Sequence, residues 1–294
     1  MDWSNYALRI LLECGLGAGL LVIKEGCYSV TKLGKFVYKD KMFSANADFI
    51  HDICYLGLFD LEESLRQEAP AGLRRLGPWA TVYEGLSKLP EKIRQSWLTF
   101  DHFYSDRAFP AALPKVFARQ PKSLMDIGAN TGKWTTKCLE HDPDVHVTMV
   151  DLPGQLEMAM ANLRQLGLEN RVTPVGMDIL NREEAFPQNM DAIWMSQFLV
   201  CFGEDDVVSI LKWAAASLAG GGSIYIQDTF WDKQELDVSA YCLINTSPYF
   251  TAIANGVSRM YTYEDMVRLA KEAGLNLVEE WNGLGLSHTL LRFE

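Results

Sequence analysis

Glycine and carboxylate residues follow three successive apolar stretches of the chain, in an order that predicts a ligand site. The stretch "SLMDIGANTGKW" (123–134) places Gly128 and Gly132 directly after the first apolar run. Glycine lets a backbone bend sharply and approach a ligand closely. Asp151 ends the second apolar run and Asp178 follows the third. Carboxylates there can accept hydrogen bonds from ribose hydroxyls and from an adenine amino group, which indicates a ligand containing a nucleoside.

The glycine spacing differs from two familiar nucleotide-binding motifs. It is G-x-x-x-G rather than the G-x-G-x-x-G of dinucleotide-binding folds, and Trp134 follows Lys133 where a P-loop has serine or threonine. Taken singly, each feature could be an ordinary tight turn or a helix-capping acid. Because the three features follow successive strands in order, together they favour S-adenosylmethionine as the cofactor.

These residues belong to a segment in which apolar strands and helices alternate. Strand patterns occur at 123–128, 145–151, 171–178, 191–200, 222–228, 275–281 and 288–293, with helices between them, including 205–218 and 263–273. Such alternation predicts a parallel sheet covered on both faces. The last two strands have no helix between them, which predicts an antiparallel closing hairpin. We therefore expect an α/β fold with a Rossmann-like methyltransferase sheet, mostly parallel with the last strand antiparallel.

The first 40 residues follow a different pattern. They predict a helix, a hairpin that turns at Glu25 and Gly26, and a second helix capped by Thr31. This is half of a winged-helix pattern without its first helices, so the chain is expected to begin within a domain. Such a module could recognise DNA, or it could serve as a dimerisation scaffold.

The following segment, residues 45–120, is predicted to be mostly helical and rich in aromatic side chains. Pro110 and Pro114 are expected to break this helical region before the sheet begins. We therefore expect two domains: a helical, partial winged-helix dimerisation domain at 1–98 and a cofactor-binding domain at 99–294.

Composition restricts the partners and the location. The chain has 27 Lys and Arg against 38 Asp and Glu, a net charge of −11, which argues against a protein that binds nucleic acid through phosphate contacts. Six widely spaced cysteines include no C-x-x-C pair, so neither a disulfide framework nor a metal site is expected. No apolar run is long enough to span a membrane, and the first residues lack the basic segment of a secretion signal. We expect a cytoplasmic protein.

Several motifs make the chain resemble the class I small-molecule O-methyltransferases that use S-adenosylmethionine and carry a winged-helix dimerisation domain. They include "LMDIGANTG", "VDLPGQLEMA", "NRVTPVGMDIL", "DAIWMSQFL" and the N-terminal "YSVTKLGKF". Relative to that family, the chain is shortened at its N-terminus. The resemblance implies a homodimer formed through the N-terminal domain, and a small, aromatic acceptor with a hydroxyl or carboxyl group.

The resemblance also assigns cofactor-binding roles to positions of this chain. Gly128, Asn130 and Gly132 would line the methionine part, Asp151 and Leu152 the ribose, and Asp178 and Ile179 the adenine, with Ser196 and Gln197 also facing the cofactor. Relatives often carry lysine at the position of Ser196, so this chain departs from the family there.

The family's acid–base machinery is not evident in "MSQFLVCFGEDD" (195–206). Plant members carry a histidine base after the fourth strand, and that position is Val200 here, which cannot accept a proton. Asp228 and Tyr104 are the catalytic candidates that remain. Phe100, Tyr104, Val200 and Tyr249 are the predicted acceptor-binding residues, while His102 is expected at the surface or an interface and His288 is expected to be structural.

Three functions follow in order of preference. The first is methyl transfer from S-adenosylmethionine, achieved largely by proximity because Val200 replaces the family's base. The second is a cofactor-binding relative that no longer methylates, and the third is a winged-helix regulator that binds DNA.

Overall fold

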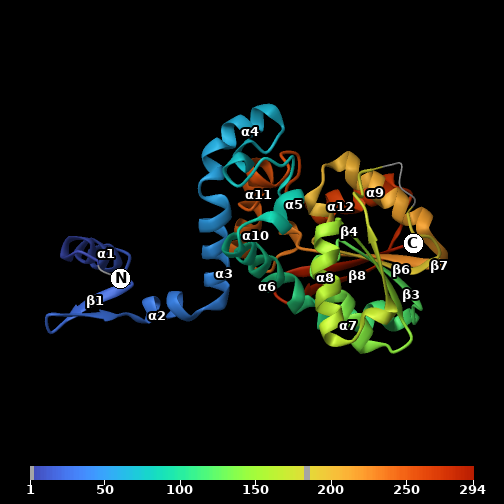
Figure 1. Cartoon of the computed structure of the whole chain (residues 1–294), viewed down its shortest axis with the longest axis horizontal. Helices are drawn as coiled ribbons and strands as arrows, with labels where there is room; N and C mark the ends of the chain where they lie inside the picture. The colour runs from blue at the N-terminus through green and yellow to red at the C-terminus, as the bar shows by residue number, and fades with distance from the viewer. Residues whose placement is uncertain (1–2, 182–185) are drawn as a thin grey trace.

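The computed structural model describes residues 3–181 and 186–294, which form an α/β body and an N-terminal arm (Figure 1). The body contains a seven-stranded sheet in the order β5-β4-β3-β6-β7-β9-β8. Its strands are β3 (Ser123–Ile127), β4 (His146–Asp151), β5 (Val172–Gly176), β6 (Met190–Ser196), β7 (Leu218–Asp228), β8 (Leu277–Leu284) and β9 (His288–Phe293). Only β9 runs against its neighbours. The predicted mostly parallel sheet with an antiparallel last strand is therefore confirmed.

Two hydrophobic cores cover the two faces of this sheet. On one face lie α9 (Glu204–Ser217) and α12 (Tyr263–Glu272), and on the other lie α7 (Lys133–His141), α8 (Pro153–Leu166) and the end of α6 (Glu91–Val116). Strand β3 supplies Leu124 to one core and Met125 to the other, and both side chains are fully buried. A strand with both faces covered is expected to be largely apolar, as Leu124, Met125 and Ile127 are, while Asp126 is a buried polar residue of the same strand.

The strand order places an opening at one edge of the sheet. Strand β3 pairs with β4 on one side and β6 on the other. After β3 the chain crosses to the face that carries α7, and after β6 it crosses to the face that carries α9. In such sheets, the reversal leaves a crevice beyond the carboxyl ends of the strands. Asp151 and Ser196 are the last residues of β4 and β6 at this edge, and the glycine turn and Asp178 follow β3 and β5 there.

Helix α6 (Glu91–Val116) continues through Pro110 and Pro114, so the expectation that these prolines break the helical region is wrong. A proline inside a helix removes one backbone hydrogen bond and costs about 3 kcal/mol or more. Burial of Phe109, Ala112 and Val116 against the sheet stabilises the last turns and outweighs this cost.

The predicted boundary between residues 98 and 99 falls within this same helix. Two domains joined by a continuous helix remain our proposal for how the chain is organised.

A helical module precedes the sheet and packs over its carboxyl edge. Its elements are α3 (Lys41–Phe49), η1 (Ile50–Cys54), η2 (Gly57–Asp60), α4 (Leu61–Gln67), η3 (Ala71–Arg75), α5 (Val82–Gly85) and η4 (Leu86–Lys88), to which a late segment contributes η8 (Trp231–Lys233), α10 (Asp237–Ile244), α11 (Ser247–Tyr249) and η9 (Phe250–Ala254). Side chains of both segments share one core, in which Phe49 and Ile53 meet Tyr249 and Phe250. Residues far apart in the sequence therefore build one roof over the sheet.

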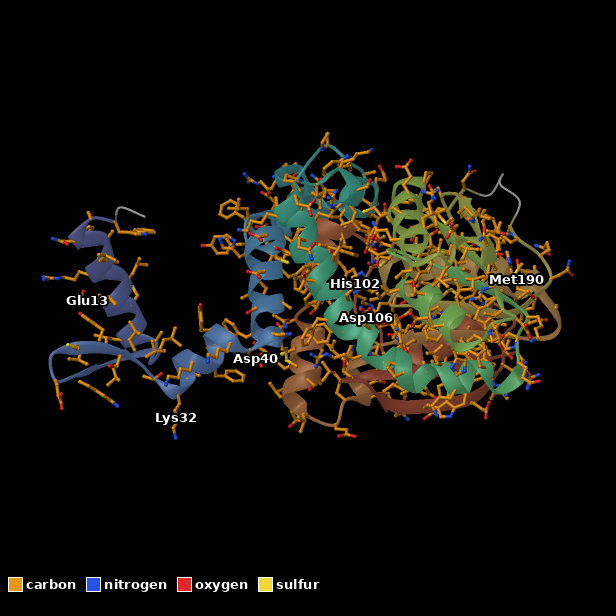
Figure 2. The ribbon with its side chains drawn as sticks, turned by 60° about the horizontal axis from the view of Figure 1, so that its bottom comes forward. Glu13, Lys32, Asp40, His102, Asp106 and Met190 are labelled. Atoms are coloured by element: carbon orange, nitrogen blue, oxygen red, sulfur yellow. The ribbon has the colours of Figure 1, made fainter. Side chains whose placement is uncertain are left out.

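The N-terminal arm stands apart from the body in two views of the molecule (Figures 1 and 2). It contains α1 (Asn5–Gly17), the hairpin β1 (Leu21–Lys24) and β2 (Cys27–Val30), and α2 (Lys32–Lys39). Thr31 caps α2 by accepting a hydrogen bond from the backbone N–H of Gly34, as predicted. Helix α1 has no buried residue.

None of the helices in the described part of the chain combines the length and the apolar character needed to cross a membrane.

Candidate functional site

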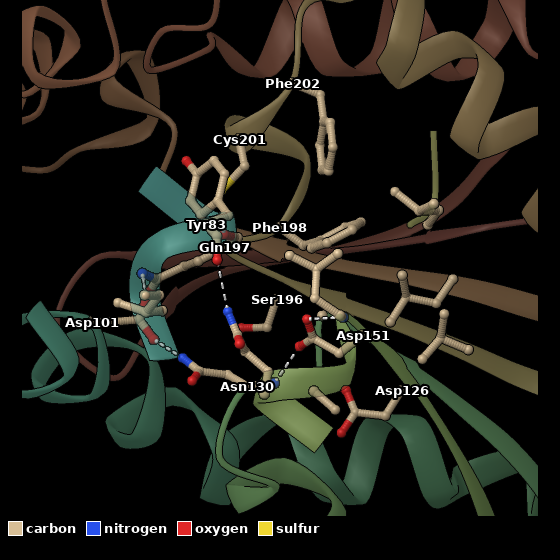
Figure 3. Close-up of a pocket in the computed structure, with 18 of the residues that line it drawn as sticks. Tyr83, Asp101, Asp126, Asn130, Asp151, Ser196, Gln197, Phe198, Cys201 and Phe202 are labelled. Carbon is tan, nitrogen blue, oxygen red and sulfur yellow. Dashed lines mark hydrogen bonds between the residues drawn. The ribbon is translucent and has the colours of Figure 1, made fainter. Parts of the chain in front are cut away.

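A cavity of about 300 Å³ lies at the carboxyl ends of β3, β4, β5 and β6, beneath α5 and α6 (Figure 3). Its size falls within the lower range of small-molecule sites. Its lining includes eight of the nine predicted cofactor-binding residues: Gly128, Asn130, Asp151, Leu152, Asp178, Ile179, Ser196 and Gln197. The sheet edge therefore brings together residues that are up to 69 positions apart in the sequence, counting from Gly128 to Gln197 (197 − 128 = 69).

The turn after β3 requires glycine at two positions, because both have a left-handed backbone and leave little room for a side chain. Gly128 has a φ of 75°, and a Cβ placed on it would lie 2.3 Å from the ring of Phe198. Gly132 has a φ of 77° and caps α7, where an added Cβ would lie 3.3 Å from Ala159. Gly132 is the one predicted cofactor residue outside the cavity lining, so it shapes the turn from behind.

The carboxylate of Asp151 is fixed by two backbone N–H groups. One oxygen accepts from Asn130 at 2.8 Å and the other from Leu152 at 2.7 Å. Burial raises the pKa of Asp151 to about 6, although both hydrogen bonds favour the ionised form. Each carboxylate oxygen retains a free lone pair for a ligand hydroxyl.

The third strand end supplies a mixed polar and apolar wall. Asp178 accepts a hydrogen bond from the backbone N–H of Leu180 at 2.9 Å, which holds the turn after β5. Ile179 lies beside it, and Phe198 and Phe202, which follow β6, line the same cavity and pack edge to face on each other with ring centres 4.9 Å apart. These apolar side chains provide the flat surface that a purine base requires.

The segment after β6 differs from the prediction in its structure. The strand ends at Ser196 rather than continuing to Val200, and Leu199–Cys201 forms a short 3₁₀ helix. Ser196 accepts a hydrogen bond from the side chain of Gln227 at 2.9 Å, and Gln197 adopts a left-handed φ of 49°. Residues in the left-handed region other than glycine are uncommon, and they cluster at functional sites.

The predicted acceptor and catalytic residues lie behind the cavity wall rather than on it. Val200 is buried in the core of the helical module, and Phe100 stacks on Phe49 with ring centres 4.0 Å apart. Tyr104 accepts a hydrogen bond from Asn46 at 2.7 Å, while Tyr249 accepts one from the indole N–H of Trp97 at 2.8 Å. Trp97 lines the cavity and Tyr249 does not, so the hydrogen bond to Trp97 connects Tyr249 to the site.

Asp228 also lies behind the lining and is almost fully buried. It accepts a hydrogen bond from the backbone N–H of Thr229, yet burial raises its pKa to about 7. Four predicted side chains and this carboxylate therefore surround the site without facing it.

Replacing Asp228 with asparagine should remove part of the pH dependence of stability. The folded protein holds a proton on Asp228 up to about pH 7, whereas the unfolded chain releases it near pH ~4. Wild type therefore loses stability relative to the variant as pH rises between these values, by on the order of 1.4 kcal/mol for each pKa unit of difference. Urea unfolding of both proteins at acidic and at slightly alkaline pH measures this change. A stability difference that is the same at both pH values would contradict the raised pKa.

Sequence reasoning missed one row of side chains on α6. Trp97, Asp101, Ser105 and Phe109 are spaced four residues apart, and all line the cavity. Such i, i+4 spacing places side chains on one face of a helix, so the signal was present in the sequence. We instead expected the face that carries Phe100 and Tyr104 to meet the acceptor.

His102 also lines the cavity, so the expectation of a surface or interface histidine is wrong. Its Nδ1 lies 3.1 Å from Asp106, and its Nε2 lies 2.9 Å from the hydroxyl of Thr131 in the glycine turn. His288 forms a buried hydrogen bond between its Nε2 and the side-chain oxygen of Gln197, at 2.7 Å. It therefore supports a residue of the cavity, although it lies outside the lining.

The lining of the cavity is rich in acidic residues. Within the described chain, six carboxylate residues line it, Glu84, Asp101, Asp126, Asp151, Asp178 and Asp206, against the single lysine Lys133. Burial raises the pKa of Asp126 to about 7, and it also raises that of Asp101. A cationic ligand relieves the repulsion among such groups, whereas an anionic ligand adds to it.

Comparison with known proteins identifies the class to which this fold and site belong. Residues 111–276 match the O-methyltransferase domain family. The chain is 23% identical to the L-tyrosine C(3)-methyltransferase of Streptomyces lavendulae over 93% of its own length and 74% of that protein. It is 25% identical to the aclacinomycin 10-hydroxylase of Streptomyces purpurascens, over 78% of this chain and 58% of that one.

A solved structure shares the architecture. This is an O-methyltransferase from neocarzinostatin biosynthesis in complex with S-adenosylmethionine and 2-hydroxy-5-methyl naphthoic acid, with a TM-score of 0.76 and 19% identity. The match covers 98% of this chain and 84% of that one. The chain belongs to the O-methyltransferase domain family, which confirms the resemblance inferred from the motifs. Enzymes of this family use S-adenosylmethionine, the predicted cofactor.

Proposed function

We propose that this protein binds S-adenosylmethionine in the cavity and transfers its methyl group to a small aromatic acceptor that carries a hydroxyl or carboxyl group. The observation that carries the proposal is the assembly of eight predicted cofactor residues around one acidic cavity at the switch point of the sheet. A buried oxygen atom supports the fit: the side-chain oxygen of Asn130 has no hydrogen-bond partner in the described structure, and it is available to a ligand donor.

The residues divide the cofactor between them. Asp151 would accept the ribose hydroxyls, Leu152 would flank the sugar, and Asp178 and Ile179 would contact the adenine. Gln197 and the glycine turn would lie along the amino-acid part, and Ser196 near the adenine. When bound, S-adenosylmethionine supplies an electrophilic methyl group on a sulfonium, and the acidic lining of the cavity favours this positive charge.

The acceptor would enter beside an aromatic wall on the roof of the cavity. Tyr83, Trp97 and Cys201 form this wall, and burial raises the pKa of both Tyr83 and Cys201 above their ordinary ranges. Neutral phenol and thiol groups present an apolar surface that orients a flat substrate and excludes water. Because Val200, Tyr104 and Asp228 lie behind this wall, we propose that the rate comes mainly from alignment rather than from a proton-abstracting residue.

Calorimetric titration with S-adenosylmethionine and S-adenosylhomocysteine tests the first half of the proposal. Absence of binding would refute both methyl transfer and any other role for this cofactor. Given binding, turnover to S-adenosylhomocysteine is then measured with a panel of phenols, naphthols and aromatic carboxylic acids.

A second candidate function is cofactor binding without methyl transfer. It is favoured by the burial of Val200 at the position of the family's base, and by the similarity to a protein named as a hydroxylase. This alternative predicts tight cofactor binding with no S-adenosylhomocysteine formed from any acceptor.

We further propose that two copies of the chain associate through the arm. Large apolar side chains are exposed along it, namely Tyr6, Leu8, Ile10, Leu11, Ile23, Tyr28, Val30, Leu33, Phe36 and Tyr38. Monomeric proteins rarely expose an apolar surface this extensive, and it marks sites of protein association. A second copy offers the same surface, and a symmetric pair would bury both arms.

Replacing both Phe36 and Tyr38 with glutamate should shift the protein from dimer to monomer. Their exposed fractions are 58% and 83%, so the substitutions cost little in a folded monomer but place charges within the proposed interface. Sedimentation velocity measures the mass in solution. The matched control is Leu166→Glu on the body, where the exposed fraction is 57% and no change of mass is expected. A wild-type protein that sediments as a monomer would rule out the association.

A further inference from the structure

The hydroxyl of Tyr83 is a buried hydrogen-bonding group without a partner. Tyr83 belongs to α5 and lines the roof end of the cavity, which lies away from Asp151 and Asn130 (Figure 3). Its hydroxyl oxygen is closed to solvent and forms no hydrogen bond within the described residues. Buried polar groups in folded proteins are almost always hydrogen-bonded, and leaving one unpaired costs stability. A ligand atom that completes the hydrogen bond explains why this group is retained.

The backbone around Tyr83 is held from two sides, so the unpaired hydroxyl does not result from a loose segment. Its backbone oxygen accepts a hydrogen bond from the side chain of Gln155 on α8, at 3.1 Å. The preceding residue, Val82, is fully buried in the core of the roof. Gly85 lies so close to the ring of Trp79 that an added Cβ would be 2.2 Å from it. Helix α5 is therefore fixed both to the cofactor-binding body and to the roof.

The other two side chains of the aromatic wall already have partners. The indole N–H of Trp97 donates to Tyr249 at 2.8 Å, and the thiol of Cys201 donates to the backbone oxygen of Gln197 at 3.7 Å. Cys201 lies beside Tyr83, but its sulfur is a weak acceptor. Burial raises the pKa of Tyr83 well above its ordinary value, so the hydroxyl keeps its proton. Within this wall, Tyr83 therefore offers the hydrogen-bond donor that is still available to a ligand.

The described lining offers no positive charge at the roof end. It contains no arginine, and its one lysine, Lys133, follows the glycine turn and lies 2.7 Å from Asp106. His102 contacts Thr131 in the same turn. A carboxylate that enters a site without a cationic partner loses its hydration and gains little in return, and the acidic lining adds repulsion. The roof end therefore disfavours an anionic acceptor.

The donor and the missing cation together restrict the chemistry of the acceptor. A hydrogen-bond donor stabilises negative charge, whereas the reacting oxygen loses negative charge as it takes the methyl group. The hydroxyl of Tyr83 is therefore suited to a second oxygen of the acceptor. We propose that Tyr83 donates its O–H group to an uncharged oxygen of the acceptor, a carbonyl or an ether, and that the site takes neutral phenolic acceptors and rejects aromatic carboxylates. This inference rests on the proposed function and makes Tyr83 a specificity-determining residue.

The test measures acceptor binding by isothermal titration at neutral pH, on protein loaded with S-adenosylhomocysteine. Three probes share one ring system: a naphthol, the acetylnaphthol, and the hydroxynaphthoic acid with its carboxylate at the position of the acetyl group. We expect wild type to bind the acetylnaphthol more tightly than either of the others. Tyr83→Phe deletes only the hydroxyl and should weaken binding of the acetylnaphthol by about two- to tenfold, the usual range for a hydrogen bond between neutral groups. Binding of the naphthol, which lacks the second oxygen, should be unchanged.

The control variant is Tyr225→Phe, which removes a tyrosine hydroxyl from β7, outside the cavity lining, and should leave the three affinities unchanged. An equal loss for the naphthol in Tyr83→Phe would assign Tyr83 a packing role. Tighter binding of the carboxylate than of the acetylnaphthol, or no binding of the acetylnaphthol, would show that the acceptor class is wrong. A weaker affinity of Tyr83→Phe for S-adenosylhomocysteine would place the hydroxyl on the cofactor. Each of these results overturns the inference alone, whereas a wild type that does not bind S-adenosylhomocysteine refutes the proposed function itself.

Discussion

Replacing Asp151 with asparagine should weaken the binding of S-adenosylmethionine by about a hundredfold or more. Two effects combine, since the variant loses the charged acceptor for two ribose hydroxyls, and hydrogen bonds to charged groups contribute about 1.5–3 kcal/mol each. In addition, the new amide group would face the backbone N–H of Asn130 or of Leu152, both of which donate to the carboxylate in wild type. The turn after β3 would then no longer be held in place. Calorimetric titration with the cofactor measures the loss.

The matched control for this prediction is Asp191→Asn at the opposite end of the sheet. Asp191 also accepts two backbone N–H groups, from Lys122 and Ser123, at 2.8 and 2.9 Å. Its substitution should lower stability without changing cofactor affinity. If Asp191→Asn weakens cofactor binding as much as Asp151→Asn does, the effect is a general loosening of β3, and the proposed ribose site is wrong.

Replacing Trp194 with alanine should lower the free energy of unfolding by about 3–5 kcal/mol, the usual cost of deleting a buried tryptophan. The ring of Trp194 is 1% exposed and stacks on Trp134 with ring centres 3.8 Å apart and planes inclined by 13°. Phe109 packs against both rings, so the substitution leaves a cavity between α6, α7 and the sheet. Neighbours that are held in three separate elements can close such a cavity only in part.

Urea unfolding followed by circular dichroism measures this loss, with Phe59→Ala as the control. Phe59 lies on the body and is 86% exposed, so its removal should change stability by less than about 0.5–1 kcal/mol. A loss below about 1 kcal/mol for Trp194→Ala would show that the stacked pair is not a structural centre of the sheet.

The cofactor half of the site could be predicted from the sequence because strand ends obey a simple geometric rule. Parallel strands place their carboxyl ends at one edge, so Gly128, Asp151, Asp178 and Ser196 could be grouped without knowledge of any contact. A second rule predicted the antiparallel β9: parallel neighbours need a crossover connection, and no helix separates β9 from β8. The predicted extent of the fourth strand was wrong, because the strand ends at Ser196 and not at Val200.

The roof of the cavity could not be predicted in the same way. Apolar and aromatic side chains lie on several faces of α6, so periodicity alone did not show that Trp97 and Asp101 face the site rather than Phe100 and Tyr104. The rotation of that helix is fixed by Phe49 and Tyr249, which are 200 residues apart in the chain and share one core. Pro110 was misjudged for the same reason, because burial of the surrounding residues outweighs its local preference.

The position of β9 between β7 and β8 has a consequence for biosynthesis. This strand is the last of the sheet to leave the ribosome, so β7 presents unpaired backbone groups while more than 50 later residues are still being made. Long-range pairings of this kind form slowly and leave a nascent sheet open to intermolecular association, a state in which chaperones act. Its first residue, His288, contacts Gln197. The side-chain amide of Gln197, which donates to Asp101 at 3.3 Å, is therefore locked only after the sheet is complete, so a partly synthesised chain could not retain the cofactor tightly.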